Sequence, residues 1–85
     1  MKEITYVITD PVGLHARPAG TLVNFVKNYS SAIEVYKGEK KADGKKLMAL
    51  MFLGIKQGDE IKVTATGLDE DIAIEAVEKF LKENL

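Results

Sequence analysis

One stretch of the chain, Gly13–Gly20 with the sequence GLHARPAG, holds the residues best suited to chemistry. It contains the only histidine and the only arginine, because every other basic residue is a lysine. Pro18 is tolerated in a helix only within the first turn, so a helix that includes it must begin near Ala16 and leave His15 at or just outside its N-terminal end. The unpaired N–H groups of a first helical turn attract anions, and the guanidinium of Arg17 can pair with phosphate oxygens. The stretch therefore favours phosphoryl chemistry at an imidazole.

The same helix end bears on the state of His15. The positive end of a helix dipole disfavours the imidazolium, which predicts a neutral, nucleophilic ring near pH 7. One histidine and no cysteine cannot form a catalytic triad or a zinc site, so we expect neither a metal nor a cofactor. Because no second acid or base is recognisable nearby, a capping or solvent-exposed histidine remains the alternative on the residues alone.

Length, composition and charge limit the remaining possibilities. The chain has 85 residues, of which 46% are hydrophobic, and a formal net charge of −1. These values predict one folded domain over residues 1–85 that does not wrap nucleic acid. So short a domain has a thin core and a shallow site, which favours a carrier or binding protein over an enzyme. The longest apolar run, Leu47–Leu53, is far shorter than the ~20 residues of a membrane span. No secretory signal precedes the first strand, so we expect a cytoplasmic protein.

Alternating apolar and polar residues define the expected sheet. Strands are predicted over residues 3–9, 32–36, 40–43 and 60–66. Together with three one-sided helices, they predict an α+β open-faced β-sandwich in the order βαββαβα. Its four-stranded, mainly antiparallel sheet carries the three helices on one face and presents polar residues such as Thr64 to water.

Apolar residues at helical spacing define the expected helices. The first helix is predicted over residues 16–29, and the second over residues 46–53, where Gly54 stops it. The second run is apolar all round, so a buried strand remains the alternative there. Asp69 is the expected N-cap of the last helix. The apolar stripe of that helix is predicted to comprise Ile72, Ala73, Ala76, Val77, Phe80 and Leu81.

Two blocks of sequence resemble the histidine-containing phosphocarrier (HPr) family of the bacterial phosphoenolpyruvate:sugar phosphotransferase system. Residues 13–19 are similar to the phosphorylation-site signature of that family, and residues 46–55, KLMALMFLGI, resemble its second characteristic block. The run QGDEI at residues 57–61 follows as in that family, and length and element order also agree. The resemblance covers the whole chain and favours a functional His15 over a capping one.

The resemblance implies a phosphoryl relay. Enzyme I, charged by phosphoenolpyruvate, is expected to transfer a phosphoryl group to Nδ1 of His15, and the phosphorylated chain is expected to pass it to the enzyme IIA unit of a sugar permease. Arg17 and the backbone amides of the helix start are expected to stabilise the group. A relay must release what it carries, so a shallow site with one arginine suits the role. We expect a monomer, as befits a freely diffusing relay.

The second block suits docking to these partners. Its apolar residues cannot all face a thin core, and exposed apolar surface marks an interaction site. We expect Leu50 and Leu53 to point inward, whereas the orientation of Phe52 is left open. The predicted docking residues are Ala16, Gly20, Leu47, Met48, Met51 and Phe52.

Lys46 departs from the family pattern. Many Gram-positive members have at this position a serine that a regulatory kinase phosphorylates, and a lysine cannot accept that phosphate.

Two other functions compete with the relay. A regulatory HPr-like interaction domain would act mainly by binding partners, but the presence of His15 argues against it. A small RNA-binding α+β domain would need aromatic residues on the exposed sheet face.

Overall fold

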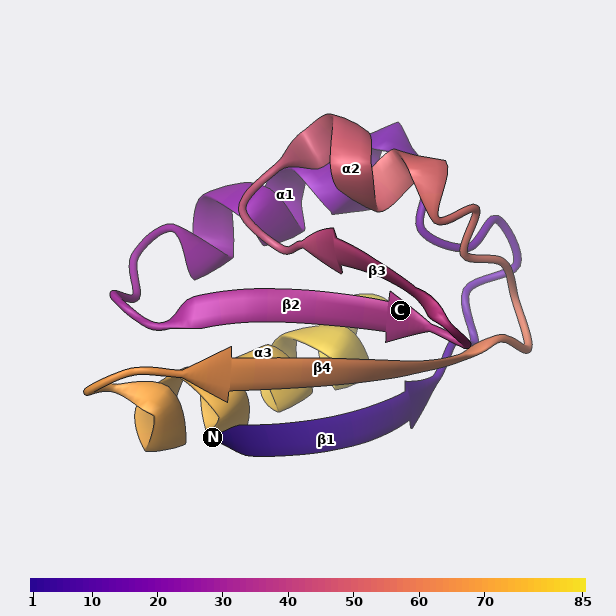
Figure 1. Ribbon diagram of the computed structural model, residues 1–85. Coiled ribbons are helices and arrows are strands. Elements are labelled where there is room, and N and C mark those ends of the chain that lie inside the picture. Colours follow the sequence, from indigo (N-terminus) through magenta and orange to yellow (C-terminus); the bar gives the residue numbers. More distant parts are fainter.

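Four strands and three helices follow one another along the chain in the order βαββαβα (Figure 1). The computed structural model describes every residue from 1 to 85. The elements are β1 (Lys2–Val7), α1 (Ala16–Val26), β2 (Ala32–Lys37), β3 (Lys40–Asp43), α2 (Leu47–Phe52), β4 (Glu60–Thr66) and α3 (Glu70–Asn84). The sheet has the strand order β1-β4-β2-β3, and every neighbouring pair is antiparallel. The predicted open-faced sandwich is confirmed, with one connected cluster of buried apolar side chains shared by the strands and the helices.

The central strand β4 shows the alternation that a half-buried strand requires. Every second residue from Ile61 to Ala65 is buried, as predicted. Thr64 corrects the prediction for the outer face, because it is only 3% exposed. Glu3 of β1 and Glu34 of β2 lie directly opposite it on the two neighbouring strands. Their longer side chains flank the threonine and shield it from water.

The strand β1 is shorter than predicted at its C-terminal end. It ends at Val7, and the chain then bonds to other segments. The N–H of Ile8 donates to the carbonyl of Asp59 (3.0 Å), and the N–H of Thr9 donates to the backbone oxygen of Leu85 (2.6 Å). Leu85 is itself buried, so the end of the chain anchors the loop that leads to the first helix.

The first two helices follow their apolar patterns but differ in their ends. The buried face of α1 consists of Ala19, Leu22, Val23 and Val26. The prediction extended this helix to residue 29, whereas α1 ends at Val26. Beyond it the N–H groups of Asn28 and Tyr29 reach back only three residues, which tightens the chain into a turn. The second run is a helix, α2, rather than a buried strand, and Gly54 with φ +63° follows it, as predicted.

The buried side of α3 differs from the predicted stripe. Ile72 is 66% exposed, whereas Ile74, which the prediction left out, is buried. Val77 lies in the middle of the buried side. At about 100° per residue, Ile74 lies about 60° from Val77 around the helix and Ile72 about 140°. Only Ile74 is therefore directed toward the core.

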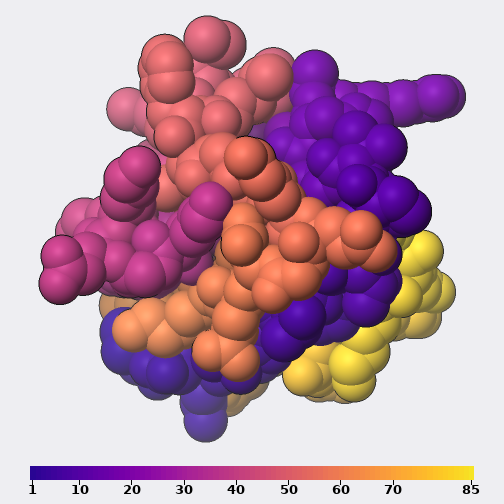
Figure 2. Space-filling view, turned by 90° about the vertical axis from the view of Figure 1, so that its right-hand side faces the viewer, coloured from indigo at the N-terminus to yellow at the C-terminus, as the bar shows by residue number.

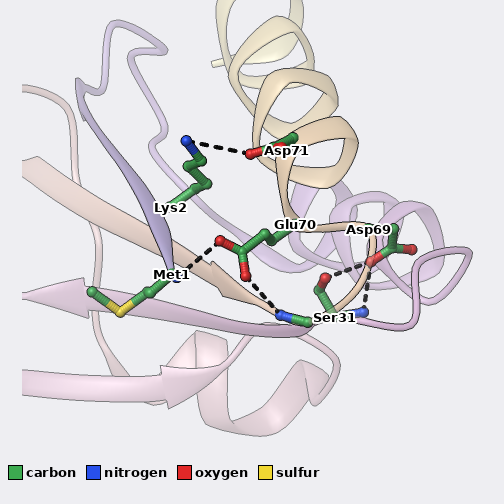
Figure 3. A network of polar contacts seen from close by, with 7 residues as sticks. Met1, Lys2, Ser31, Asp69, Glu70 and Asp71 are labelled. Atoms are coloured by element: carbon green, nitrogen blue, oxygen red, sulfur yellow. Dashed lines mark hydrogen bonds and ion pairs between the residues drawn. The ribbon is translucent and has the colours of Figure 1, made fainter.

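Asp69 joins the loop between α1 and β2 to the loop before α3 (Figure 3). It takes the N-cap position of α3, as predicted, but its carboxylate makes no capping bond. The carboxylate instead accepts hydrogen bonds from the N–H groups of Ser30 (2.8 Å) and Ser31 (2.9 Å) and from the hydroxyl of Ser31. The bond from the Ser31 hydroxyl, and next the bond from the Ser30 N–H, lower the pKa of Asp69 to about 2. The side chain thus ties β2 to the start of α3.

Asp69→Asn should lower the melting temperature at pH 7, because an amide has neither the charge nor the second acceptor oxygen that these donors use. A carboxylate whose pKa is lowered by folding stabilises the fold above its unfolded pKa of about 4, and this contribution is lost as the pH falls toward about 2. The difference in melting temperature between wild type and variant, followed by circular dichroism, should therefore shrink between about pH 4 and pH 2. Asp71→Asn is the control, because that carboxylate makes only an exposed ion pair with Lys2 (3.4 Å). The account is contradicted if both variants lose the same melting temperature, or if the difference between wild type and Asp69→Asn does not change with pH.

Candidate functional site

His15 lies at the start of α1 with its ring unbound. It is the N-cap residue, with extended backbone angles (φ −87°, ψ −177°), and its side chain makes no capping hydrogen bond. Its carbonyl accepts the first helical bond, from the N–H of Ala19 (3.0 Å). The helix therefore begins where Pro18 predicted, and His15 is exposed to any molecule that approaches this end of the protein.

The first turn of α1 offers free donors beside the ring. The N–H groups of Ala16 and Arg17 have no acceptor within the protein, because no helical carbonyl lies four residues before them and the first helical bond is donated by Ala19. The guanidinium of Arg17 is exposed and forms no ion pair. Both features favour binding of an anion next to His15.

A shallow hollow of about 320 Å³ lies beside the ring. It is lined by Asp10, His15, Arg17, Pro18, Thr21, Phe80 and Asn84. Figure 2 looks at this end of the molecule. The purple residues around His15, the salmon α2 and the orange residues that follow α2 form one continuous face there. The site is therefore open and suits a small group delivered by another protein better than an enclosed substrate.

Gly13 allows the loop before His15 to lie against the segment that follows α2. Its φ is +76°, in the left-handed region that favours glycine. A Cβ at this position would lie 2.6 Å from the carbonyl oxygen of Ile55 and 2.8 Å from the Cα of Lys56. The next residue, Leu14, is buried and donates its N–H to the same Ile55 oxygen (3.1 Å). This backbone contact fixes the place where His15 emerges.

The helix α2 divides its apolar residues between core and surface. Leu50 and Leu53 are buried, as predicted. Met48 is 62% exposed, and Phe52, whose orientation the sequence left open, is 79% exposed. The exposed apolar face of α2, called here the α2 face, comprises Leu47, Met48, Met51 and Phe52. Of the other two predicted docking residues, Ala16 is exposed and Gly20 is half-buried.

Comparison with known families agrees with this geometry. A family model described as "PTS HPr component phosphorylation site" matches residues 2–83, nearly the whole chain. The chain belongs to the HPr family. Its role is therefore that of a phosphocarrier in the phosphotransferase system.

Individual relatives support the assignment to the HPr family. The phosphocarrier protein HPr of Lysinibacillus sphaericus is 42% identical over 83 residues, which cover 98% of this chain and 94% of that protein. The crystal structure of HPr-C-His from Thermoanaerobacter tengcongensis matches with a TM-score of 0.93 at 42% identity, over 98% of this chain and 93% of that one. Crh, the Bacillus subtilis catabolite repression protein crystallised as a swapped dimer, matches with a TM-score of 0.79 at 30% identity, over 100% and 98%. The fold of this chain is thus shared by an HPr structure and by a regulatory relative.

Within the HPr fold, Lys46 takes the N-cap position of α2. Its side chain is exposed and makes no capping bond. A cation there meets the positive end of the helix, which is locally unfavourable. Lys46 therefore adds a positive charge at one end of the α2 face. No carboxylate of the chain neutralises this charge, because Lys46 forms no ion pair.

Lys37 and Asp59 are the residues that sequence reasoning missed. Lys37 is the last residue of β2 and Asp59 directly precedes β4, yet the Lys37 ammonium lies 3.0 Å from the Asp59 carboxylate. The N–H of Lys56 donates to that carboxylate (2.8 Å) and is the main reason why the pKa of Asp59 is lowered, followed by the Lys37 side chain. No local sequence pattern predicts the pairing of Lys37 with Asp59, because the two residues lie 22 positions apart in the chain.

The described chain contains no group of three or more histidine, cysteine, aspartate or glutamate side chains placed to hold a metal ion. None of its helices is both long enough and apolar enough to cross a membrane.

Gly13→Ala should destabilise the HPr fold by at least about 1–2 kcal/mol, because alanine is strained at a positive φ and its methyl group would collide with Ile55. Gly20→Ala is the matched control. That glycine lies within α1 and has no atom within 4 Å of an added Cβ, so the change should stabilise the fold by roughly 0.5–1 kcal/mol. Urea unfolding measures both values. A neutral Gly13→Ala would show that the close backbone contact is not needed.

Proposed function

We propose that this HPr-family chain accepts a phosphoryl group on Nδ1 of His15 from phosphorylated enzyme I and passes it to the enzyme IIA units of sugar permeases. The observation that carries the proposal is the exposed, unbound ring of His15 at a helix start whose donors are free. The match of nearly the whole chain to the HPr family supports the same reading.

In the proposed transfer, the lone pair of Nδ1 forms a bond to phosphorus while the bond between phosphorus and its group on enzyme I breaks. The leaving group keeps the electron pair of that bond. The three phosphoryl oxygens then lie near the N–H groups of Ala16 and Arg17, and the Arg17 guanidinium offers further hydrogen bonds. The reverse steps deliver the group to enzyme IIA. Water and one free arginine hold the group loosely, which keeps the barrier to the second transfer low.

We propose that the α2 face and the exposed Ala16 form the docking surface for both partners, with Gly20 behind it. An apolar face with two exposed methionines can adapt to partners of different shape. The partners then supply most of the catalytic groups, and the chain is a carrier rather than an enzyme. It needs no cofactor.

The chain is proposed to work in the cytoplasm. It is also proposed to work as a monomer, because His15, Arg17 and the α2 face all come from one molecule. Size-exclusion chromatography tests the monomer against a swapped dimer of the kind in which the relative Crh crystallised.

Regulation without phosphorylation is the second candidate, since Crh has the same fold. The free ring of His15 favours the carrier function over it. Lys46 cannot be phosphorylated as a serine is, so a serine-linked switch has no acceptor at that position. An RNA-binding domain of this kind would stack bases on aromatic rings of the outer sheet face. Tyr36 of β2 is an aromatic residue there, but the Lys62 ammonium lies over its ring, 4.6 Å from the ring centre, and occupies the face on which a base would stack.

Incubation with radiolabelled phosphoenolpyruvate and enzyme I should place an acid-labile label on the wild-type chain and none on His15→Ala. Arg17→Gln should still accept label but at a rate lowered roughly 10- to 100-fold, because it loses one charged contact to the transferred group. Circular dichroism of each variant checks the fold. Label that persists in His15→Ala would exclude His15 as the acceptor.

Met48→Glu should weaken docking to enzyme I and raise the KM of phosphoryl transfer from enzyme I to this chain roughly tenfold. The melting temperature should change little, because the Met48 side chain is mostly exposed. Leu68→Glu is the control. It introduces the same charge at a fully exposed leucine in the loop before α3, away from the α2 face. Equal effects of the two variants on KM would show that added negative charge, rather than the α2 face, governs docking.

A further inference from the structure

Lys37, the last residue of β2, contacts both ends of the segment between α2 and β4. Its Nζ donates to the carbonyl of Gly54 (2.7 Å), just after α2, and pairs with the carboxylate of Asp59 (3.0 Å), just before β4. The intervening residues, 54–59, are called here the 54–59 segment. One ammonium group therefore closes this segment into a loop.

The 54–59 segment is also the support of the loop that carries His15. The carbonyl oxygen of Ile55, the second residue of the segment, accepts the N–H of Leu14 (3.1 Å). Gly13 lies against the same oxygen so closely that a side chain does not fit. Ile55 and Leu14 are both buried. A displacement of this segment would therefore move the residue directly before His15.

We propose that Lys37 is a positioning residue of the phosphocarrier site, which holds the C-terminal end of α2 and the His15 loop in the relative position that a partner recognises. The inference rests on the proposed function, in which His15 accepts the phosphoryl group and the α2 face docks. Lys37 itself makes no contact with His15 or Arg17 and acts through Gly54 and Asp59.

The surroundings of Lys37 set it apart from the other lysines of the β2–β3 hairpin. Its side chain is 32% exposed and that of Asp59 31%, so water screens this pair less than a fully exposed one. Lys41 instead pairs with Glu34 (3.4 Å), and the ammonium group of Lys40 forms no ion pair. Hydrogen bonds that involve a charged donor are stronger than neutral ones, which suits Lys37 to restrain a backbone segment.

The kinetic consequence follows from what Lys37 does not touch. Because Lys37 does not contact His15 or Arg17, removal of its ammonium group should leave the rate of the phosphoryl transfer step nearly unchanged. A looser 54–59 segment reduces the fraction of molecules in which the α2 face and His15 are aligned, and this weakens the encounter with enzyme I. The expected result is a rise in KM of about three- to tenfold with kcat within about twofold of wild type.

The test compares Lys37→Met with Lys40→Met, a change of the same size and charge on the same hairpin. Lys37→Met should raise KM for the transfer from enzyme I, and amide hydrogen exchange at Leu14 should become faster, because its bond to Ile55 opens more often. Lys40→Met should change neither. Lys37→Arg keeps the charge and the donors, and it should restore both readouts in part.

Several outcomes overturn the proposal. Unchanged KM and unchanged Leu14 exchange in Lys37→Met show that the bridge has no role at the site. A higher KM with unchanged Leu14 exchange shows that Lys37 contacts the partner directly. If Lys37→Met does not fold, Asp59→Asn replaces it, since it removes the charged partner of Lys37 and retains the lysine, and the same two readouts decide. If the wild type takes no label from enzyme I, the proposed function fails, and Leu14 exchange alone then decides the positional role of Lys37.

Discussion

The phosphocarrier face of this chain depends on one contact between two backbone segments, at Gly13 and Ile55. Because no side chain stands between them, the Ile55 oxygen can accept the N–H of Leu14, whose side chain is buried. The chain is therefore fixed at Leu14, directly before the unbound ring of His15. The N–H groups of the first turn of α1 then find no partner in the protein, and they remain available for an anion. A rigid support directly before an unbound ring allows the ring to be presented without being enclosed.

Four of the positive charges of the chain fall into two groups by what they contact. Lys37 and Lys45 donate to backbone carbonyls, of Gly54 and Tyr29, and so restrain the ends of α2 and α1. Arg17 and Lys46 stand at helix starts and pair with no carboxylate. A carrier needs this separation. In the proposed transfer, a carboxylate bound to Arg17 would compete with the phosphoryl group, whereas additional cations around the group would slow its release.

The sequence predicts the elements well, because their signals are local. Period-two alternation predicts the sheet, and Pro18 predicts the start of α1 to within a residue. The wrong or missing predictions depend on contacts between distant segments. The hydrogen bond that Ser31 donates to Asp69 and the ion pair between Lys37 and Asp59 form only after two loops meet, and neither residue type nor spacing indicates the partner. Ile72 and Ile74 both lie beside the apolar stripe of α3, and the packing of α3 in the folded chain decides that Ile74 is buried and Ile72 exposed.

The shortness of α2 explains why its apolar residues and the His15 loop must share a support. A helix of six residues is unstable by itself, because nucleation costs more than so few hydrogen bonds return. The buried Leu50 and Leu53 hold it from below, and the bond from Lys37 to Gly54 holds the chain just beyond its end. The segment that begins at Gly54 also supports Leu14 through Ile55. A partner that recognises the α2 face together with His15 therefore recognises two surfaces whose relative position is set by the same few backbone atoms. A movement of one surface displaces the other.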